Sequence, residues 1–200
     1  LSASAKIMVK NNIRKSLLAQ GQLLSESFIL KSSKKIQKST IEIMGMNSIR
    51  NILLYFPYRS EISLIIIMLE IKKYPIDIYV PKIISDEEMK FNQLEDDSFF
   101  EKNKFGINEV VSNKFLEPSL FDIMIIPFVG VDKNGARLGY GGGFFDRALK
   151  TFIKKDVKPT IIGLGYNYQI QDKIFGEVHD IKYDVVITES QIIRYNSSMI

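Results

Sequence analysis

The run Ile123-Met-Ile-Ile-Pro127, followed by Arg137-Leu-Gly-Tyr-Gly-Gly-Gly-Phe-Phe-Asp-Arg147, indicates a strand, a ligand-binding loop and a helix in succession. The apolar run is typical of a buried strand, and residues 144–154 have a helical pattern. Between them, Gly139 and Gly141 to Gly143 lack the Cβ atoms that would hold a backbone away from a ligand. Such a loop, ahead of a helix N-terminus, presents main-chain N–H groups to an anion. The stretch therefore predicts an anion site in an α/β fold.

Charged residues surround these glycines. Arg137 and Arg147 carry permanent positive charge on either side of the loop, and Asp146 adds a hard oxygen ligand suited to Mg²⁺. The glycine spacing is neither a Walker A sequence nor the dinucleotide fingerprint, and no predicted strand ends immediately before it. A tight turn would need only one or two glycines. We therefore favour a site for a nucleotide triphosphate and its metal over a purely structural turn.

The rest of the chain alternates helical and strand patterns. Helices are expected at 5–20, at 25–45 with Ser25 as N-cap, at 64–73 and at 144–154. Strands are expected at 51–56, 76–80, 122–127, 160–165 and 184–188, the first two closed by Pro57 and Pro81. The more polar segment 83–117 is expected to form loops with short strands. This alternation predicts the α/β class: a layered fold with a mostly parallel central sheet flanked by helices, preceded by an N-terminal helical pair.

One domain is expected over residues 1–200, because no repeat or low-complexity linker interrupts the chain. The chain opens at Leu1 and has a methionine at position 8, so residues 1–7 are a candidate for a non-native or disordered leader. In the first helix, the apolar face is expected to contain Ile7, Met8, Leu17 and Leu18.

The composition excludes several classes of protein. The chain has no cysteine, so a disulfide framework and a cysteine-ligated zinc site are excluded, which fits a reducing cytoplasm. No apolar run reaches the ~18 residues that span a bilayer, and the N-terminus lacks the apolar region of a secretory signal. We therefore expect a cytoplasmic protein without a membrane partner.

The positive charge is concentrated near the N-terminus. Residues 1–50 hold nine Lys and Arg against Glu26 and Glu42, whereas the whole chain has a net charge of only +4. RNA, an anionic lipid surface, a polyanionic small molecule and plain solvated helix faces are all compatible with this excess. Base stacking has little support because Phe28 is the only aromatic residue in the segment. We favour solvated helix faces and expect no nucleic-acid partner.

Two further groups could bind a ligand. Lys10 and Arg14 lie four residues apart on one helical face, where they clamp phosphates or face solvent. Phe56, Tyr58 and Glu61 follow a predicted strand, at the end where α/β sheets carry ligands. They line a pocket for a flat heterocycle or cover the core, and the residues alone do not separate these alternatives.

The C-terminal region supplies two more candidates. His179 is the only histidine, which excludes a histidine metal cage, and we expect it at the surface or in a cap. Asp184, at a predicted strand start, is expected to join Asp146 as an outer-sphere Mg²⁺ partner.

The order of these motifs resembles the 5-formyltetrahydrofolate cyclo-ligase family, also called 5,10-methenyltetrahydrofolate synthetases, over nearly the whole chain. The most specific match is the family signature, found here as Ile126-Pro-Phe-Val-Gly-Val-Asp132 and again from Arg137 to Asp146. Further matches, in chain order, are Lys10-Asn-Asn-Ile-Arg14, Glu61, Phe105-Gly-Ile-Asn-Glu109, Gly163-Leu-Gly-Tyr-Asn-Tyr-Gln169, and His179-Asp180 with Asp184.

The resemblance implies a ligase that forms a C–N bond, with 5-formyltetrahydrofolate and ATP as substrates, Mg²⁺ as cofactor, and a monomer or weak homodimer. Arg137 and Arg147 are the implied catalytic residues. Implied ATP contacts are Lys10, Arg14, Arg137, Leu138, Gly139, Tyr140, Gly141, Gly142, Gly143, Phe144 and Phe145. Implied contacts to the reduced folate are Phe56, Glu61, Phe105, Tyr140, Gly142 and Phe144. The implied metal positions are Asp146 and Asp184.

Four residues depart from the family pattern. Phe144 and Phe145 stand where many members have tyrosines, so any hydroxyl contact there is lost. Val110 stands where many relatives carry a proline, which affects loop stiffness, and Phe105 stands where some have a tryptophan, which keeps a stacking surface without the N–H donor. Two alternatives stay open: a sugar-phosphate or acyl-transfer enzyme on a similar scaffold, and a basic nucleotide- or RNA-binding module.

Overall fold

The computed structural model describes residues 3–150, 159–177 and 180–196. Its main sheet has eight strands in the order β12-β11-β10-β7-β1-β2-β3-β6. The five inner strands are parallel: β11 (Val185–Ile187), β10 (Thr160–Leu164), β7 (Ile123–Ile125), β1 (Asn51–Leu53) and β2 (Asp77–Ile83). The outer strands pair antiparallel: β12 (Ile192–Arg194), β3 (Met89–Leu94) and β6 (Phe115–Leu116). The mostly parallel sheet predicted from the sequence is confirmed.

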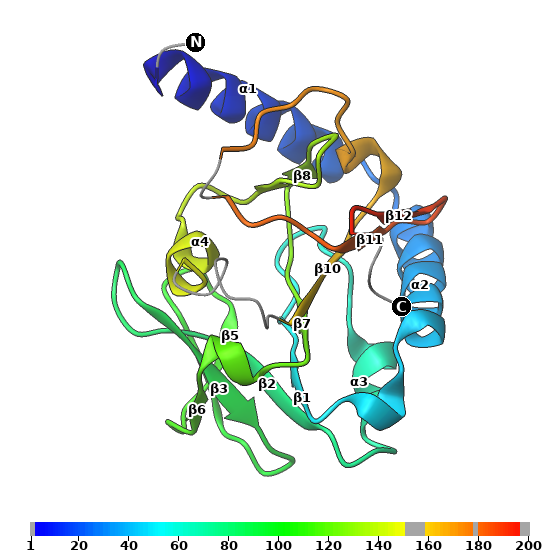
Figure 1. Cartoon of the computed structure of the whole chain (residues 1–200), viewed down its shortest axis with the longest axis vertical. Coiled ribbons are helices and arrows are strands. Elements are labelled where there is room, and N and C mark those ends of the chain that lie inside the picture. The colour runs from blue at the N-terminus through cyan, green and yellow to red at the C-terminus, as the bar shows by residue number, and fades with distance from the viewer. Residues whose placement is uncertain (1–2, 151–158, 178–179, 197–200) are drawn as a thin grey trace.

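Helices cover both faces of this sheet. They are α1 (Ala3–Gln22), α2 (Glu26–Ile43), α3 (Ile65–Ile71) and α4 (Phe144–Ala148). Figure 1 shows α2 and α3 on one side, α4 on the other, and α1 crossing beside β8 at one end. Two small hairpins pair β4 (Phe100–Lys102) with β5 (Asn108–Val110), and β8 (Gly130–Val131) with β9 (Arg137–Leu138). Short 3-10 turns lie at Met46–Ser48, Pro118–Leu120 and Asn167–Gln169.

Strand β1 explains why the sheet needs both layers. Successive side chains of a strand point to opposite faces, and here both faces are apolar. Ile52 and Leu54 pack in the core cluster that also contains Ile67 of α3, whereas Leu53 packs in the second cluster with Leu149 after α4. All three β1-region side chains are fully buried, so neither face tolerates water.

Polar residues fix the helix starts. The Ser25 hydroxyl accepts the Phe28 N–H at 3.3 Å, which confirms the predicted N-cap of α2. Gln37 of α2 is buried, and its side-chain oxygen is satisfied there because it accepts the N–H groups of Ile66 and Ile67, at 2.8 and 3.4 Å. These donors belong to the first turn of α3 and have no partner within that helix, so Gln37 docks α3 onto α2.

Two expected element boundaries are wrong. Strand β2 continues through Pro81 to Ile83, paired with β3. On its other side, β1 pairs only with Asp77 to Tyr79, so Pro81 faces no strand there that would need its missing N–H. A strand also does end immediately before the glycine loop, since β9 closes at Leu138. β9 has only two residues, too few for a recognisable alternation in the sequence.

The helical expectations also need correction. Helix α1 begins at Ala3, so residues 3–7 lie in a helix; whether 1–7 are native stays a prediction. Ile7 and Met8 are 60% and 62% exposed, so they do not share the buried face with Leu17. Helix α4 ends at Ala148, where buried Leu149 turns into the core, and the predicted continuation to 154 passes outside the described residues.

Candidate active site

The glycine loop joins β9 to α4 at the end of the sheet where β7 delivers the chain into the β8–β9 hairpin. Gly141 and Gly143 adopt left-handed backbone conformations with φ of 105° and 66°, and Gly143 is the N-cap of α4. Gly139 has a different reason to be glycine. A Cβ atom there would lie 2.7 Å from Nη1 of Arg137, so the loop can fold over the guanidinium only without a side chain.

Arg137 is the buried cation beneath this loop. Its Nε donates to the Pro127 carbonyl at 2.8 Å, and its guanidinium lies 5.1 Å from the centre of the Phe145 ring. Nη1 is 3.6 Å from Oδ2 of Asp146, while the other oxygen, Oδ1, is buried without a hydrogen-bond partner. A buried carboxylate oxygen without a donor is costly, and a bound cation or donor would satisfy it. Asp146 therefore fits the predicted metal ligand.

Arg14 reaches the loop from α1. Its Nε donates to the Gly139 carbonyl at 2.7 Å, and Nη1 donates to Asn11 at 2.5 Å. Burial and the nearby charge of Arg137 lower the pKa of Arg14. Two guanidinium groups held this close repel each other, so the space between them favours an anion. The structure brings together Arg14, Arg137 and the glycines, as the sequence predicted.

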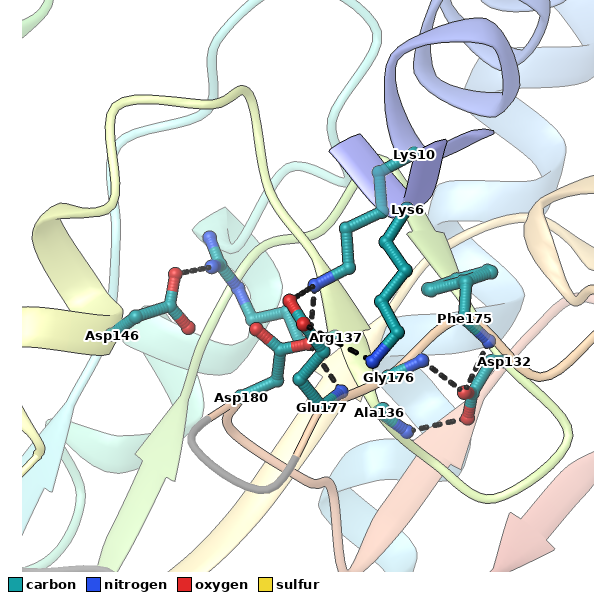
Figure 2. Close-up of polar contacts among 10 residues, drawn as sticks. All are labelled: Lys6, Lys10, Asp132, Ala136, Arg137, Asp146, Phe175, Gly176, Glu177 and Asp180. Carbon is teal, nitrogen blue, oxygen red and sulfur yellow. Dashed lines mark hydrogen bonds and ion pairs between the residues drawn. The ribbon is translucent and has the colours of Figure 1, made fainter. Parts of the chain in front are cut away.

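Lys10, one turn earlier on α1, binds carboxylates instead of the loop. Its ammonium lies 2.6 Å from Asp180 and 3.1 Å from Glu177, as Figure 2 shows. Burial lowers the pKa of Lys10, but hydrogen bonds and charge attraction from Asp180 and Glu177 together raise it above its ordinary value. Lys10 is therefore a charged residue at the edge of the site, held by acidic partners.

Asp180 is a site residue that the sequence prediction missed. Its neighbour Ile181 accepts the backbone N–H of Arg137 at 2.8 Å, so the Asp180 segment runs along β9. The motif His179-Asp180 was visible in the sequence, but nothing local separates Asp180 from Asp184 as a ligand. His179 itself lies outside the described residues.

Asp184 has a structural role in this fold. It is 2% exposed and precedes β11, at the amino ends of the parallel strands, whereas Asp146 lies near Pro127 beyond the carboxyl end of β7. Its oxygens accept the Ile161 N–H at 2.9 Å and the Asn196 amide at 3.3 Å. The predicted pairing of Asp184 with Asp146 is therefore not what the structure shows, and Asp180, which pairs with Lys10 in the segment beside β9, is the alternative candidate. No cluster of three or more His, Cys, Asp or Glu side chains suited to a metal occurs among the described residues.

A small pocket adjoins the loop. Its lining includes Ser60, Glu61, Phe128, Tyr140, Tyr168 and Gln169. The Glu61 carboxylate accepts the Tyr58 N–H at 2.7 Å. Burial raises the pKa of Glu61 to about 7, despite the opposing effects of that N–H, the charge of Arg137 and the Tyr140 hydroxyl. Burial and the Glu61 charge in turn raise the pKa of Tyr140, so Tyr140 is a neutral donor.

The predicted aromatic contacts divide into two groups. Phe105 and Phe144 meet edge to face at 6.4 Å between ring centres, beside Lys104. Phe56 instead meets Phe100 of β4 at 5.7 Å. Each of these ring pairs includes one phenylalanine from the hairpin region at 99–111, Phe100 or Phe105. Both of these rings are exposed, so a flat ligand could cover them.

Arg147 lies between the glycine loop and the turn that joins β2 to β3, since a Cβ on Gly143 would lie 2.7 Å from its Nη1. Its Nε donates to the Glu87 carbonyl at 2.8 Å in the turn between β2 and β3, and its guanidinium lies 5.1 Å from the Phe144 ring centre. It is exposed. Arg137 is buried at the loop whereas Arg147 lies at its exposed edge, and the catalytic role expected for Arg147 stays a prediction.

The comparisons with known proteins point to one family. The model of the "5-formyltetrahydrofolate cyclo-ligase family" matches residues 6–189. A 5-formyltetrahydrofolate cyclo-ligase of Mycoplasma pneumoniae is 29% identical over 91% of this chain and 99% of its own, and one of Haemophilus influenzae is 28% identical over 78% and 85%.

Solved structures extend the likeness to the fold. A 5,10-methenyltetrahydrofolate synthetase of Aquifex aeolicus superimposes with a TM-score of 0.81 and 26% identity, covering 96% of this chain and 95% of that one. The M. pneumoniae synthetase gives 0.73 and 27%, covering 90% and 98%. With the family match spanning nearly the whole chain and these enzymes sharing its fold, this protein belongs to the 5-formyltetrahydrofolate cyclo-ligase family and is a ligase.

Proposed function

We propose that the protein converts 5-formyltetrahydrofolate to 5,10-methenyltetrahydrofolate, with ATP converted to ADP and phosphate. The observation that carries this proposal is the position of Tyr140. It belongs to the glycine loop beside Arg14 and Arg137, yet its hydroxyl interacts with Glu61 in the adjoining pocket. One residue thus joins an anion-binding loop to the Glu61 side of the small pocket, the arrangement that a reaction between a nucleotide and a pterin would require.

The proposed reaction has two steps. The formyl oxygen on N5 attacks the γ-phosphorus of ATP, the bond to the β-phosphate oxygen breaks, and ADP leaves. N10 then attacks the activated carbon and loses its proton, and the C–O bond breaks to release phosphate and leave the methenyl bridge. Little covalent chemistry falls to the protein, so positioning and charge neutralisation dominate.

Residues of the site divide this work. Arg137 and Arg14 would bind the phosphates, because they are close cations beside a loop whose glycines admit a ligand to the backbone. Glu61 would accept N–H donors of the pterin, in a pocket where Tyr140 fixes its carboxylate. Asp146, with one unpartnered buried oxygen, and Asp180 would hold Mg²⁺, which neutralises phosphate charge when bound.

The remaining expectations belong to the same proposal. We propose a monomer or weak homodimer that acts in the cytoplasm on small molecules, with no nucleic-acid or membrane partner. Over the described part of the chain, no helix has both the length and the apolar character needed to cross a bilayer.

The direct test is formation of the methenyl chromophore. The purified protein, 5-formyltetrahydrofolate, ATP and Mg²⁺ are mixed at mildly acidic pH, where the product is stable, and absorbance is followed with and without ATP. We expect growth only in the complete mixture. A folded protein that binds ATP but forms no chromophore would contradict the proposal.

Asp146→Asn tests the metal assignment. The amide keeps the shape of the side chain but loses the negative charge, so we expect turnover to fall by at least about tenfold, most strongly at limiting Mg²⁺. Initial rates over a Mg²⁺ series measure this effect, with Asp122→Asn as the control at the far end of the sheet. Equal Mg²⁺ dependence in both variants would remove Asp146 from the metal site.

A further inference from the structure

A buried carboxylate outside the reacting groups ties two distant segments together. Asp132, in the turn between β8 and β9, is completely buried. Oδ1 accepts the N–H groups of Asn134 and Ala136, each at 2.9 Å. Oδ2 accepts those of Phe175 and Gly176, at 3.1 and 2.9 Å. Figure 2 shows this carboxylate between Ala136 on one side and Phe175 and Gly176 on the other.

Each segment that Asp132 holds leads directly into the nucleotide site. Ala136 is followed by Arg137, the buried cation of the loop. Gly176 is followed by Glu177, which pairs with Lys10 and donates its own N–H to Asp180 at 2.8 Å. Asp180 completes the carboxylate pair around Lys10. The carboxylate therefore sits one residue away from both halves of the charged cluster.

The close approach of these segments is a second, independent observation. A Cβ atom on Gly176 would lie 2.2 Å from Cβ of Ala136 and 3.1 Å from Oδ2 of Asp132. Real Cβ atoms do not approach this closely, so the 175–177 segment reaches the hairpin only because residue 176 is glycine. Gly176 and the Asp132 carboxylate together fix a short distance between the 175–177 segment and the β8–β9 hairpin.

Only a carboxylate meets the demands of this position. Four N–H donors converge on two oxygens, and an asparagine would offer one oxygen and turn two of its own donors against N–H groups. A neutral acceptor would also lose the added strength of hydrogen bonds to an ionised group.

We propose that Asp132 is a positioning residue of the nucleotide site: it holds Arg137 in register with Glu177 and Asp180, and through them places Lys10. The inference rests on the proposed function, because it assumes that these charged groups bind ATP and its metal. Asp132 touches neither substrate. It acts by setting the distance between groups that do.

The experiment compares four variants with the wild type. Asp132→Asn removes one acceptor oxygen and with it two of the four hydrogen bonds, and Gly176→Ala inserts the clashing Cβ. The double variant Gly176→Ala/Ala136→Gly takes away the atom that the new Cβ meets. Asp122→Asn is the matched control, since Asp122 also accepts backbone N–H groups, from Arg50 and Asn51, but at the opposite end of the sheet. MgATP affinity is measured by calorimetry, and KM for each substrate by chromophore formation, below the unfolding temperature of every variant.

We expect Asp132→Asn and Gly176→Ala each to weaken MgATP binding by about tenfold or more, because a 1 Å misplacement costs up to about a hundredfold in rate. KM for 5-formyltetrahydrofolate should change less than about twofold, since the Glu61 pocket keeps its own contacts. The double variant should recover most of the affinity, and Asp122→Asn should lose stability alone.

Three results would overturn the inference: wild-type MgATP affinity in folded Asp132→Asn, an equal loss for both substrates, or no recovery in the double variant. If Asp132→Asn does not fold, the comparison of Gly176→Ala with the double variant Gly176→Ala/Ala136→Gly still tests the inference. A wild-type protein that forms no chromophore would refute the proposed function instead, while the calorimetric comparison would still test the role of Asp132.

Discussion

Replacing Glu61 by glutamine is expected to change how the stability of the protein depends on pH. In the folded protein, burial raises the pKa of this carboxyl from 4.5 to about 7. A raised pKa means that folding favours the neutral form, so the native state is most stable, relative to the unfolded chain, at pH below the unfolded pKa. As pH rises through the window from 4.5 to about 7, the unfolded chain ionises first and the native state loses stability.

The size of this loss follows from the two pKa values. The difference between 4.5 and about 7 corresponds to about 3 kcal/mol, and the partial exposure of Glu61 makes that figure an upper limit. Glutamine cannot ionise, so the variant avoids this loss. Its unfolding free energy relative to wild type should therefore rise by up to about 3 kcal/mol between about pH 4 and about pH 8.

Urea unfolding across this pH range measures the difference directly. Glu117→Gln is the matched control, because that carboxyl is exposed and its replacement should shift stability by the same small amount at every pH. The reasoning fails if the Glu61→Gln difference is flat with pH, or if it changes in the opposite direction. The same variant should raise KM for the folate, because an amide replaces one of the two carboxyl oxygens with an N–H donor that opposes the N–H groups of the pterin.

Two other substitutions test how the loop and α1 are held. Gly139→Ala would place its Cβ 2.7 Å from Arg137 Nη1, and we expect about 1–3 kcal/mol lower stability and weaker MgATP binding, measured by urea unfolding and calorimetry. Gly45→Ala is the control, because Gly45 also has a negative φ and its new Cβ would meet only the Ser48 hydroxyl, at 3.2 Å. Leu17→Ala should cost about 2–5 kcal/mol, because Leu17 is 3% exposed and packs against Gly130 of β8, whereas Met8→Ala on the 62% exposed face should cost little. Equal losses for Leu17→Ala and Met8→Ala would show that α1 is not docked as described.

Local signals in the sequence were sufficient for the central layers. Ser25 predicted a cap because its hydroxyl needs only a donor three residues away, and the apolar run at 123–127 predicted a strand because both of its faces are buried. The element boundaries that were predicted wrongly depend on pairing between segments far apart in the sequence. Pro81 ends no strand because β1 is too short to reach it, and the length of a neighbouring strand is not encoded near residue 81.

The site shows the same division between local and distant information. The glycine loop and Arg137 were predicted from one continuous stretch, whereas Arg14 was an open candidate from its helical spacing with Lys10 until the resemblance to the family favoured it. Asp180 and Asp184 are only four residues apart, and both are buried carboxylates. They differ because Ile161 of β10 donates to Asp184, while Lys10 of α1 pairs with Asp180. Only the packing of β10 and α1 separates these roles.

The charges of the site also balance one another before any ligand binds. Lys10 is paired with Asp180 and Glu177, and Arg137 lies beside Asp146. A partly buried charge without a partner is costly, so these pairs keep the site folded when it is empty. A nucleotide alone would bring anions for the cations and leave the carboxylates uncompensated. A nucleotide with its divalent cation supplies both signs of charge. Its phosphates would take the place of the carboxylates beside Lys10 and Arg137, and its cation would take the place of these two side chains beside the carboxylates. If the proposed reaction holds, the acidic residues that hold Lys10 and Arg137 are the groups that would favour a metal-bound nucleotide over a free one.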